Sequence, residues 1–212
     1  MILNKLYYLY SFKEIQYLHS IKILRYTYKL ILYSYYIIRI VPLYFIGTVS
    51  SFVPRKKHLW LFGSRAGIDF TDNAKYLYLY VNSRINDINA IWITKNNNIY
   101  RMLAKNKLPV AYAYSINAIW MCLRAKIIFT THGKNDINSP LTSGCIHVEL
   151  YHFVIALKKL RYDVFNHYHL ANRIKLMLED PFIYFKPDYS FSSSTFAAQK
   201  VISSLNLSNE NV

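Results

Sequence analysis

Apolar and polar positions follow two different rhythms along this 212-residue chain. From residue 54 onward, short apolar runs alternate with segments of helical periodicity. Runs typical of buried strands occupy residues 58–64, 90–94, 109–114, 126–131, 146–151 and 188–192. The intervening pattern predicts helices over residues 72–82, 98–106, 116–123 and 195–205, with Ser115 as a helix cap. Strands that alternate with helices predict an α/β fold with a parallel, Rossmann-like sheet.

The first 53 residues have a different pattern. They are apolar and aromatic, with scattered basic residues and almost no acidic ones. Lys22, Arg25 and Lys29 fall on one face of a helix, which is typical of an amphipathic segment lying on an anionic membrane. Residues 30–54 exceed the roughly 20 residues needed to cross a bilayer, but Arg39 and Pro42 weigh against a crossing. We favour surface association, with a membrane span and ordinary core helices as alternatives.

A hydrophilic break, Pro54–Lys57, separates these two patterns. The predicted organisation is therefore a membrane-associating helical segment over residues 1–53 and a Rossmann-like domain over residues 54–212. The early charges at Lys5, Lys13 and Glu14 argue against a signal peptide.

The formal net charge of +15 predicts a polyanionic neighbour, such as an anionic membrane surface or a phosphate-bearing substrate. Nucleic acid is the third polyanion that this charge would suit, but the lysines are spread out and form no known binding motif, so we predict no nucleic-acid partner. The two cysteines have no metal or redox spacing, and the histidines outside the candidate site show no metal-ligand pattern. We predict no metal or other cofactor.

Parallel sheets place their chemistry at the carboxyl ends of the strands. The polar residues predicted there are Gly63–Arg65, Thr94–Lys95, Ser115, Thr131–Gly133 and His152.

These strand-end residues carry a family resemblance. The segments are LWLFGSRAGIDFTDNAKYLYLYV (59–81), AIWITK (90–95), LRAKIIFTTHGKNDIN (123–138), ELYH and ALKKLRYD (149–163), and PDYSFSSS (187–194). In this order they resemble the CDP-glycerol glycerophosphotransferases, which build teichoic acids and phosphate-containing capsules. The resemblance runs from about residue 30 to the end of the chain.

The resemblance implies the acceptor-side, N-terminal half of a GT-B transferase. Such an enzyme would move polyol phosphate from CDP-glycerol, or a related CDP-polyol, to a lipid-linked or polymeric acceptor at the cytoplasmic face of the membrane. The family's nucleotide-binding half is expected to be missing here. The alternative is therefore a truncated, inactive remnant, or a partner subunit of such an enzyme.

Within the resemblance, His152 is the expected catalytic base, because imidazole can accept the proton of an attacking hydroxyl near neutral pH. Lys158 and Lys159 would balance phosphate charge, with a solvated basic helix face as the alternative. The family's aromatic-His-Gly turn reads Tyr151-His152-Phe153 here, and Phe replaces Gly poorly where a turn needs positive φ.

Four further residues are candidates for the acceptor site. Gly133 would allow close approach, and His132 would contact acceptor phosphate or have a structural role. Ser64 and Asn73 lie near a predicted helix start, where anions bind. Thr71 or Asp72 is expected to be the N-cap of this helix, and capping explains Asp72 better than anion binding does.

Overall fold

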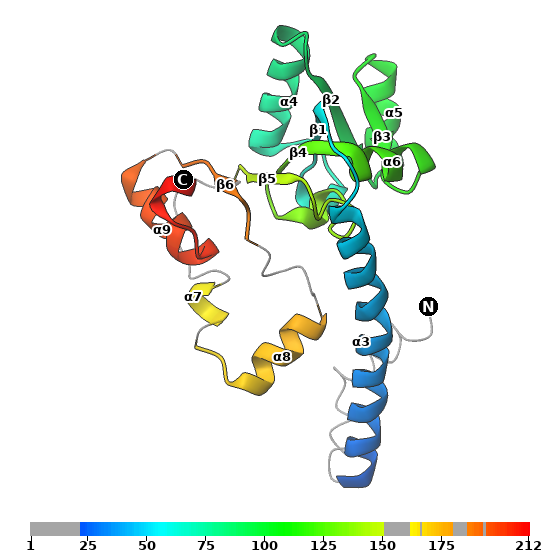
Figure 1. Ribbon diagram of the computed structural model, residues 1–212, viewed down its shortest axis with the longest axis vertical. Coiled ribbons are helices and arrows are strands. Elements are labelled where there is room, and N and C mark those ends of the chain that lie inside the picture. Colours follow the sequence, from blue (N-terminus) through cyan, green and yellow to red (C-terminus); the bar gives the residue numbers. More distant parts are fainter. Residues whose placement is uncertain (1–21, 151–161, 166, 180–185, 193) are drawn as a thin grey trace. The chain divides into compact units, whose positions relative to one another are not determined.

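The computed structural model describes residues 22–150, 162–165, 167–179, 186–192 and 194–212 (Figure 1). The chain divides into two compact units, residues 1–42 and 43–212, and each is described by itself. The domain boundary predicted after residue 53 stays a prediction.

Helix α3 (Lys22–Ser51) is a 30-residue helix that contains Pro42. By length and composition alone, its segment Tyr26–Ser51 could cross a membrane, and it is the one such helix among the described residues. Signal sequences and buried core helices satisfy the same criterion. The basic face at Lys22, Arg25 and Lys29 and the choice between surface and span therefore stay predictions.

Six strands form one parallel sheet in the order β3-β2-β1-β4-β5-β6. Their bounds are β1 Lys56–Phe62, β2 Asn89–Thr94, β3 Val110–Tyr112, β4 Ala125–Thr130, β5 Ile146–Glu149 and β6 Tyr189–Ser190. Each predicted strand is present within a few residues of its expected position, and the predicted α/β fold with a parallel sheet is confirmed. The two edge strands, β3 and β6, are the shortest.

Helices α4 (Asp72–Arg84), α5 (Asn97–Lys105), α6 (Ile116–Arg124) and α9 (Thr195–Leu205) match the predicted helices. The Ser115 hydroxyl accepts a hydrogen bond from the Ala118 amide and caps α6, as predicted. The N-cap of α4 is Thr71, whose side chain makes no capping bond. Two helices were not predicted, α7 (Tyr162–Phe165) and α8 (Leu170–Glu179). Short 3-10 turns, η1 (Arg65–Gly67), η2 (Lys134–Asp136) and η3 (Asn209–Asn211), complete the described elements.

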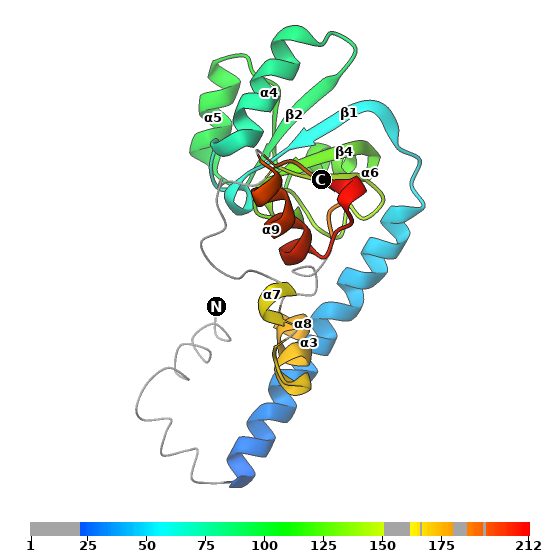
Figure 2. The same ribbon diagram turned by 90° about the vertical axis from the view of Figure 1, so that its left-hand side faces the viewer.

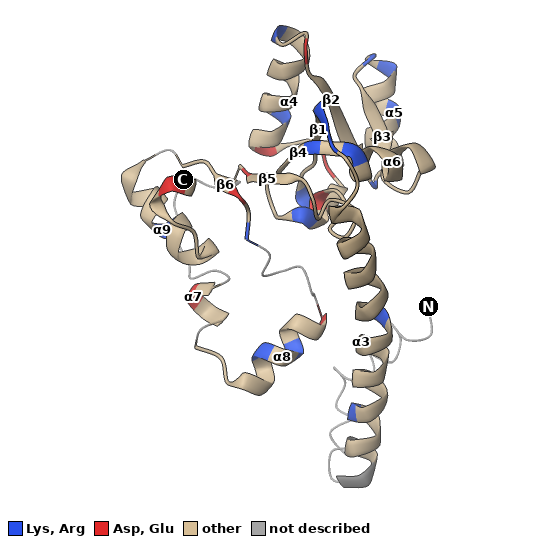
Figure 3. Cartoon of the chain, viewed as in Figure 1, with Lys and Arg blue, Asp and Glu red and all other residues tan. Residues whose placement is uncertain are grey.

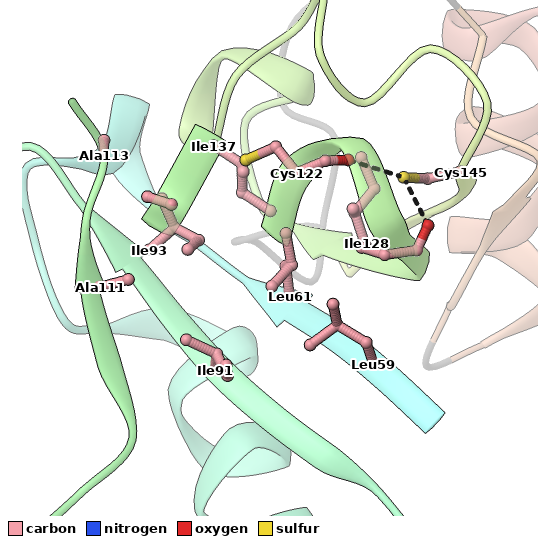
Figure 4. Close-up of a cluster of buried hydrophobic side chains, with 12 residues drawn as sticks. Leu59, Leu61, Ile91, Ile93, Ala111, Ala113, Cys122, Ile128, Ile137 and Cys145 are labelled. Carbon is pink, nitrogen blue, oxygen red and sulfur yellow. Dashed lines mark hydrogen bonds between the residues drawn. The ribbon is translucent and has the colours of Figure 1, made fainter. Parts of the chain in front are cut away.

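Helices cover both faces of the sheet (Figure 2). Alternate residues of each strand point to opposite faces, so each face has its own core. Helices α4 and α5 pack over an aromatic-rich core that contains Phe62, Trp92 and Phe129. Helix α6 and the 137–145 loop cover the other face, where Leu61, Ile93 and Ile128 pack (Figure 4).

Arg55 joins the last turn of α3 to α6. Its guanidinium donates to the Cys122 carbonyl at 2.9 Å and also to the Ser50 carbonyl. The buried Ser50 hydroxyl in turn donates to the Leu141 carbonyl at 2.6 Å. One side chain therefore donates to carbonyl groups at the ends of two helices. Carbonyl groups at these positions receive no hydrogen bond from their own helix.

Both cysteines are buried thiols on the α6 side of the sheet. Cys145 lies 3.1 Å from the Ala125 carbonyl, and Figure 4 shows it beside the end of α6. Burial raises the pKa of Cys122 to about 12 and that of Cys145 to about 11.

We expect Arg55→Ala to lower the free energy of unfolding by about 2 kcal/mol, because buried carbonyl groups lose a charged donor. Urea denaturation followed by circular dichroism measures this change. Lys57→Ala, at an exposed neighbour, is the control and should change the free energy by less than about 0.5 kcal/mol. Equal effects of the two variants would contradict the proposed role of Arg55.

Candidate functional site

The site lies where the strand order reverses. From β1 the chain proceeds to β2 and β3 on one side of the sheet, and it later returns to β4 on the other side of β1. The loops that leave β1 and β4 therefore diverge at the carboxyl edge of the sheet. In parallel α/β sheets, ligands bind in the crevice outside such a switch point.

The Asp136 carboxylate joins these two loops. One oxygen, Oδ1, accepts the Ala66 amide of the loop after β1 at 2.6 Å. The other, Oδ2, accepts the amides of Thr131 and His132 after β4, at 2.7 and 2.9 Å. Asp136 is fully buried, so its two oxygens take the place of water for three backbone N–H groups.

Two glycines allow this close approach. A Cβ at Gly63 would lie 2.7 Å from the Asp136 carbonyl oxygen, and one at Gly67 would lie 2.8 Å from it. Gly67 also has a φ of +81°, which side chains other than hydrogen rarely allow. These contacts explain physically why an aromatic-Gly-Ser turn is followed by a spaced glycine in this sequence.

Lys95 ties the end of β2 to the same loops. Its amide donates to the Gly67 carbonyl at 2.7 Å, and its Nζ donates to the Asn135 carbonyl at 2.6 Å. Burial lowers the pKa of Lys95, and the nearby Asp136 carboxylate opposes that shift. The Thr94 hydroxyl also donates a hydrogen bond to the Gly67 carbonyl, at 2.9 Å. The carboxyl ends of β1, β2 and β4 therefore meet in one hydrogen-bonded rim.

A second buried polar cluster connects β4 with β5. The Thr130 hydroxyl lies 2.7 Å from both His147 Nε2 and Glu149 Oε2. His147 and Glu149 approach each other to 3.3 Å and are almost completely buried. The amide of His147 donates to Asp188 at 2.7 Å, which extends the cluster to the start of β6. His147 is one of the histidines without a metal-ligand pattern in the sequence, and neither it nor Glu149 was predicted to have a role at the site.

The four predicted acceptor-site residues in the described part of the chain occupy different positions in the rim. Ser64 is buried and donates to the Asp69 carbonyl at 3.0 Å, so its hydroxyl holds the loop after β1. Gly133 has a φ of +96° and begins η2. His132 is exposed, and its Nδ1 lies 2.8 Å from the Thr131 hydroxyl. Of these three residues, His132 is the one whose side chain faces solvent.

Asn73 has a positioning contact. Its Nδ2 donates to the Leu150 carbonyl at 3.0 Å, and the Leu150 amide donates to the Thr130 carbonyl at 2.7 Å. These bonds fix the last described residue before Tyr151. His152, Lys158 and Lys159 lie outside the described residues, so their predicted roles stay predictions.

Within the ranges that the structure describes, no group of three or more His, Cys, Asp or Glu side chains is placed to hold a metal ion. The polar groups at the rim bind one another and backbone atoms, and this makes the rim a rigid frame. His132 is an exposed side chain at this rim.

A family model described as CDP-glycerol:poly(glycerophosphate) glycerophosphotransferase matches residues 45–212. No curated protein matches the chain significantly.

Among solved structures, the wall teichoic acid polymerase TagF matches with 16% identity and a TM-score of 0.54. A CDPG-soaked TagF structure matches with 15% identity and a TM-score of 0.55. Both matches cover 74% of this chain and 38% of the TagF chain. A second, longer soak gives 14% identity and a TM-score of 0.56, with 95% of this chain and 48% of the other covered. At these identities the likeness shows the fold alone, and the chain spans less than half of the length of the structures it matches.

We expect Asp136→Ala to destabilise the domain by about 3 kcal/mol or more, because three backbone amides lose their buried acceptor. Urea denaturation measures the change. Asp87→Ala, at an exposed carboxylate, should have an effect within about 0.5 kcal/mol. A small effect at Asp136 would mean that water or another group replaces the carboxylate.

The same carboxylate predicts a pH dependence. Burial raises the pKa of Asp136, although the amides of Thr131 and His132 oppose the shift. The folded state therefore keeps this proton to higher pH than the unfolded chain does, whose Asp pKa is about 3.9. The stabilising contribution from protonation is present below about pH 4 and is lost as pH rises through the folded pKa.

Denaturation of the wild type and of Asp136→Asn at several pH values checks this sign. The stability difference between wild type and variant should shift against the wild type as pH rises from about 4. A difference that does not change with pH, or that shifts the other way, would contradict the predicted direction.

Proposed function

This chain belongs to the CDP-glycerol:poly(glycerophosphate) glycerophosphotransferase family, and on that premise we propose that it forms the acceptor-side half of a GT-B polyol-phosphate transferase. The family match over residues 45–212 carries this proposal. The donor would be CDP-glycerol or a related CDP-polyol, and the acceptor a lipid-linked or polymeric chain in teichoic acid or capsule synthesis.

The geometry of the rim supports this assignment. The Asp136 carboxylate holds together the loops after β1 and β4 at the point where the strand order reverses. Ligands usually bind at this point in parallel α/β sheets. The exposed His132 would contact phosphate groups of the acceptor at this edge. Phosphoryl transfer depends mainly on positioning and on charge balance, and a rigid rim favours the first of these.

In the proposed reaction, an acceptor hydroxyl oxygen attacks the phosphorus of the glycerophosphoryl group. A new O–P bond forms, the bond from that phosphorus to the CMP oxygen breaks, and CMP leaves. The hydroxyl proton passes to the imidazole of His152. Lys158 and Lys159 would balance the phosphate charge. The backbone of Leu150, two residues before His152, is hydrogen-bonded to Asn73 and Thr130, and this supports a position for His152 near the rim.

We place the reaction at the cytoplasmic face of the cell membrane. The basic, aromatic N-terminal segment and the apolar helix α3 support peripheral attachment to anionic lipid. A membrane location would bring the rim close to a lipid-linked acceptor.

A second candidate is a non-catalytic partner subunit or remnant with the acceptor-side fold. Phe153 favours it, because this residue occupies the place of the glycine in the family's aromatic-His-Gly turn. The partner would then supply the nucleotide-binding half.

Incorporation of labelled CDP-glycerol into polymer on isolated membranes tests the transferase proposal. The wild type should incorporate label, and His152→Ala should lower incorporation at least about 100-fold through loss of the general base. His167→Ala, at an exposed histidine, is the matched control and should retain activity. If the wild type incorporates nothing while a full-length homologous enzyme works in parallel, the catalytic proposal fails and the partner-subunit candidate takes its place.

A further inference from the structure

Helix α6 is apolar on two opposite sides. Its inner side contributes Ala118 and Cys122 to the core. Its outer side carries Ile116, Ile119 and Trp120, at the i, i+3 and i+4 positions of one stripe. Their exposed fractions are 84%, 37% and 55%. Exposed apolar side chains that gather on one face of a helix indicate an interaction site, and this set is called here the α6 outer stripe.

The surroundings of the α6 outer stripe are basic. No Asp or Glu occurs between residues 88 and 135 or between residues 43 and 68 (Figure 3). The Arg124 guanidinium lies 5.5 Å from the centre of the Trp120 ring. Lys56 begins β1 beside Ala125, which directly follows α6, so it lies next to the end of this helix, and Lys57 follows it. An apolar stripe beside the cations of Arg124 and Lys56 complements an anionic partner better than a neutral or basic one.

The end of α3 presents a similar surface next to it. Phe45, Val49 and Phe52 are exposed at the i, i+4 and i+7 positions. Arg55 bonds carbonyl groups of both Ser50 and Cys122, so the last turn of α3 and the end of α6 are held together. Arg55 therefore holds the carboxyl end of α6 close to the end of the one described helix that is apolar enough for a membrane.

We propose that the α6 outer stripe inserts into the interfacial layer of an anionic lipid bilayer. Tryptophan suits this depth because its ring is apolar and its N–H is polar, and basic side chains beside it reach the lipid headgroups. The apolar groups contribute by burial, and the cations contribute by attraction to anionic headgroups. This proposal extends the membrane location in the proposed function from the N-terminal segment to the Rossmann-like domain, and its test requires no transferase activity.

Trp120 makes the test specific. Only two other tryptophans are present, Trp60 and Trp92, and both pack in the core on the opposite face of the sheet. Helix α3 contains none. The full chain is mixed with phosphatidylcholine vesicles that contain 25% phosphatidylglycerol, with brominated acyl chains as the quencher. Trp120 emission should shift to the blue and be quenched, and Trp120→Phe should abolish both changes. Vesicles of phosphatidylcholine alone should give at least about tenfold weaker binding.

A double variant, Ile116→Asp with Ile119→Asp, tests the energetic contribution. It should weaken partitioning into the anionic vesicles about tenfold or more, because two apolar side chains are lost and two like charges are added. Tyr80→Asp, at an exposed aromatic residue of α4 on the other side of the sheet, is the matched control. It adds one charge and should change partitioning less than about threefold.

Two results would overturn the proposal. If vesicles sediment the chain but Trp120 emission is unchanged, the membrane contact belongs to the N-terminal segment alone, and the proposed membrane location survives. If the chain self-associates without lipid and the double variant makes it monomeric, the α6 outer stripe is an interface between two copies. Light scattering distinguishes that outcome. Neither result bears on polymer synthesis, which is measured separately.

Discussion

A buried carboxylate holds the functional edge of this sheet together. Asp136 accepts hydrogen bonds from amides in the loops that leave β1 and β4, the neighbouring parallel strands at which the strand order reverses. Without this acceptor, the buried Thr131 amide would have no partner, and the amides of Ala66 and His132 would lose theirs. Gly63 and Gly67 let the backbone pass close to the Asp136 carbonyl, and Lys95 adds a bond to the neighbouring Asn135 carbonyl.

The periodicity of the sequence predicted the sheet well because buried strands and amphipathic helices leave different patterns. The six strands and the helices α4, α5, α6 and α9 lie within a few residues of their predicted positions. Helices α7 and α8 were not predicted. Helix α7 has four residues, and α8 buries none of its residues, so neither has the apolar face packed on a core that periodicity detects.

The site was predicted less completely. Strand-end residues were expected at the right edge, but Asp136, His147 and Glu149 were missed as partners. Their contacts join residues distant in sequence, such as Ala66 and Asp136, and no local spacing reveals such a pair. Asp136 is the third residue after Gly133 and lies among polar neighbours, so its local sequence does not distinguish it from a surface carboxylate. The predicted roles of His152, Lys158 and Lys159 stay predictions.

The two buried thiols have a practical consequence for anyone handling the protein. With pKa values of about 11 and 12, Cys145 and Cys122 carry almost no thiolate at neutral pH. Alkylating reagents should therefore modify them only when α6 lifts from the sheet. The alkylation rate of these two thiols therefore measures how often this part of the domain opens, and no added label is needed.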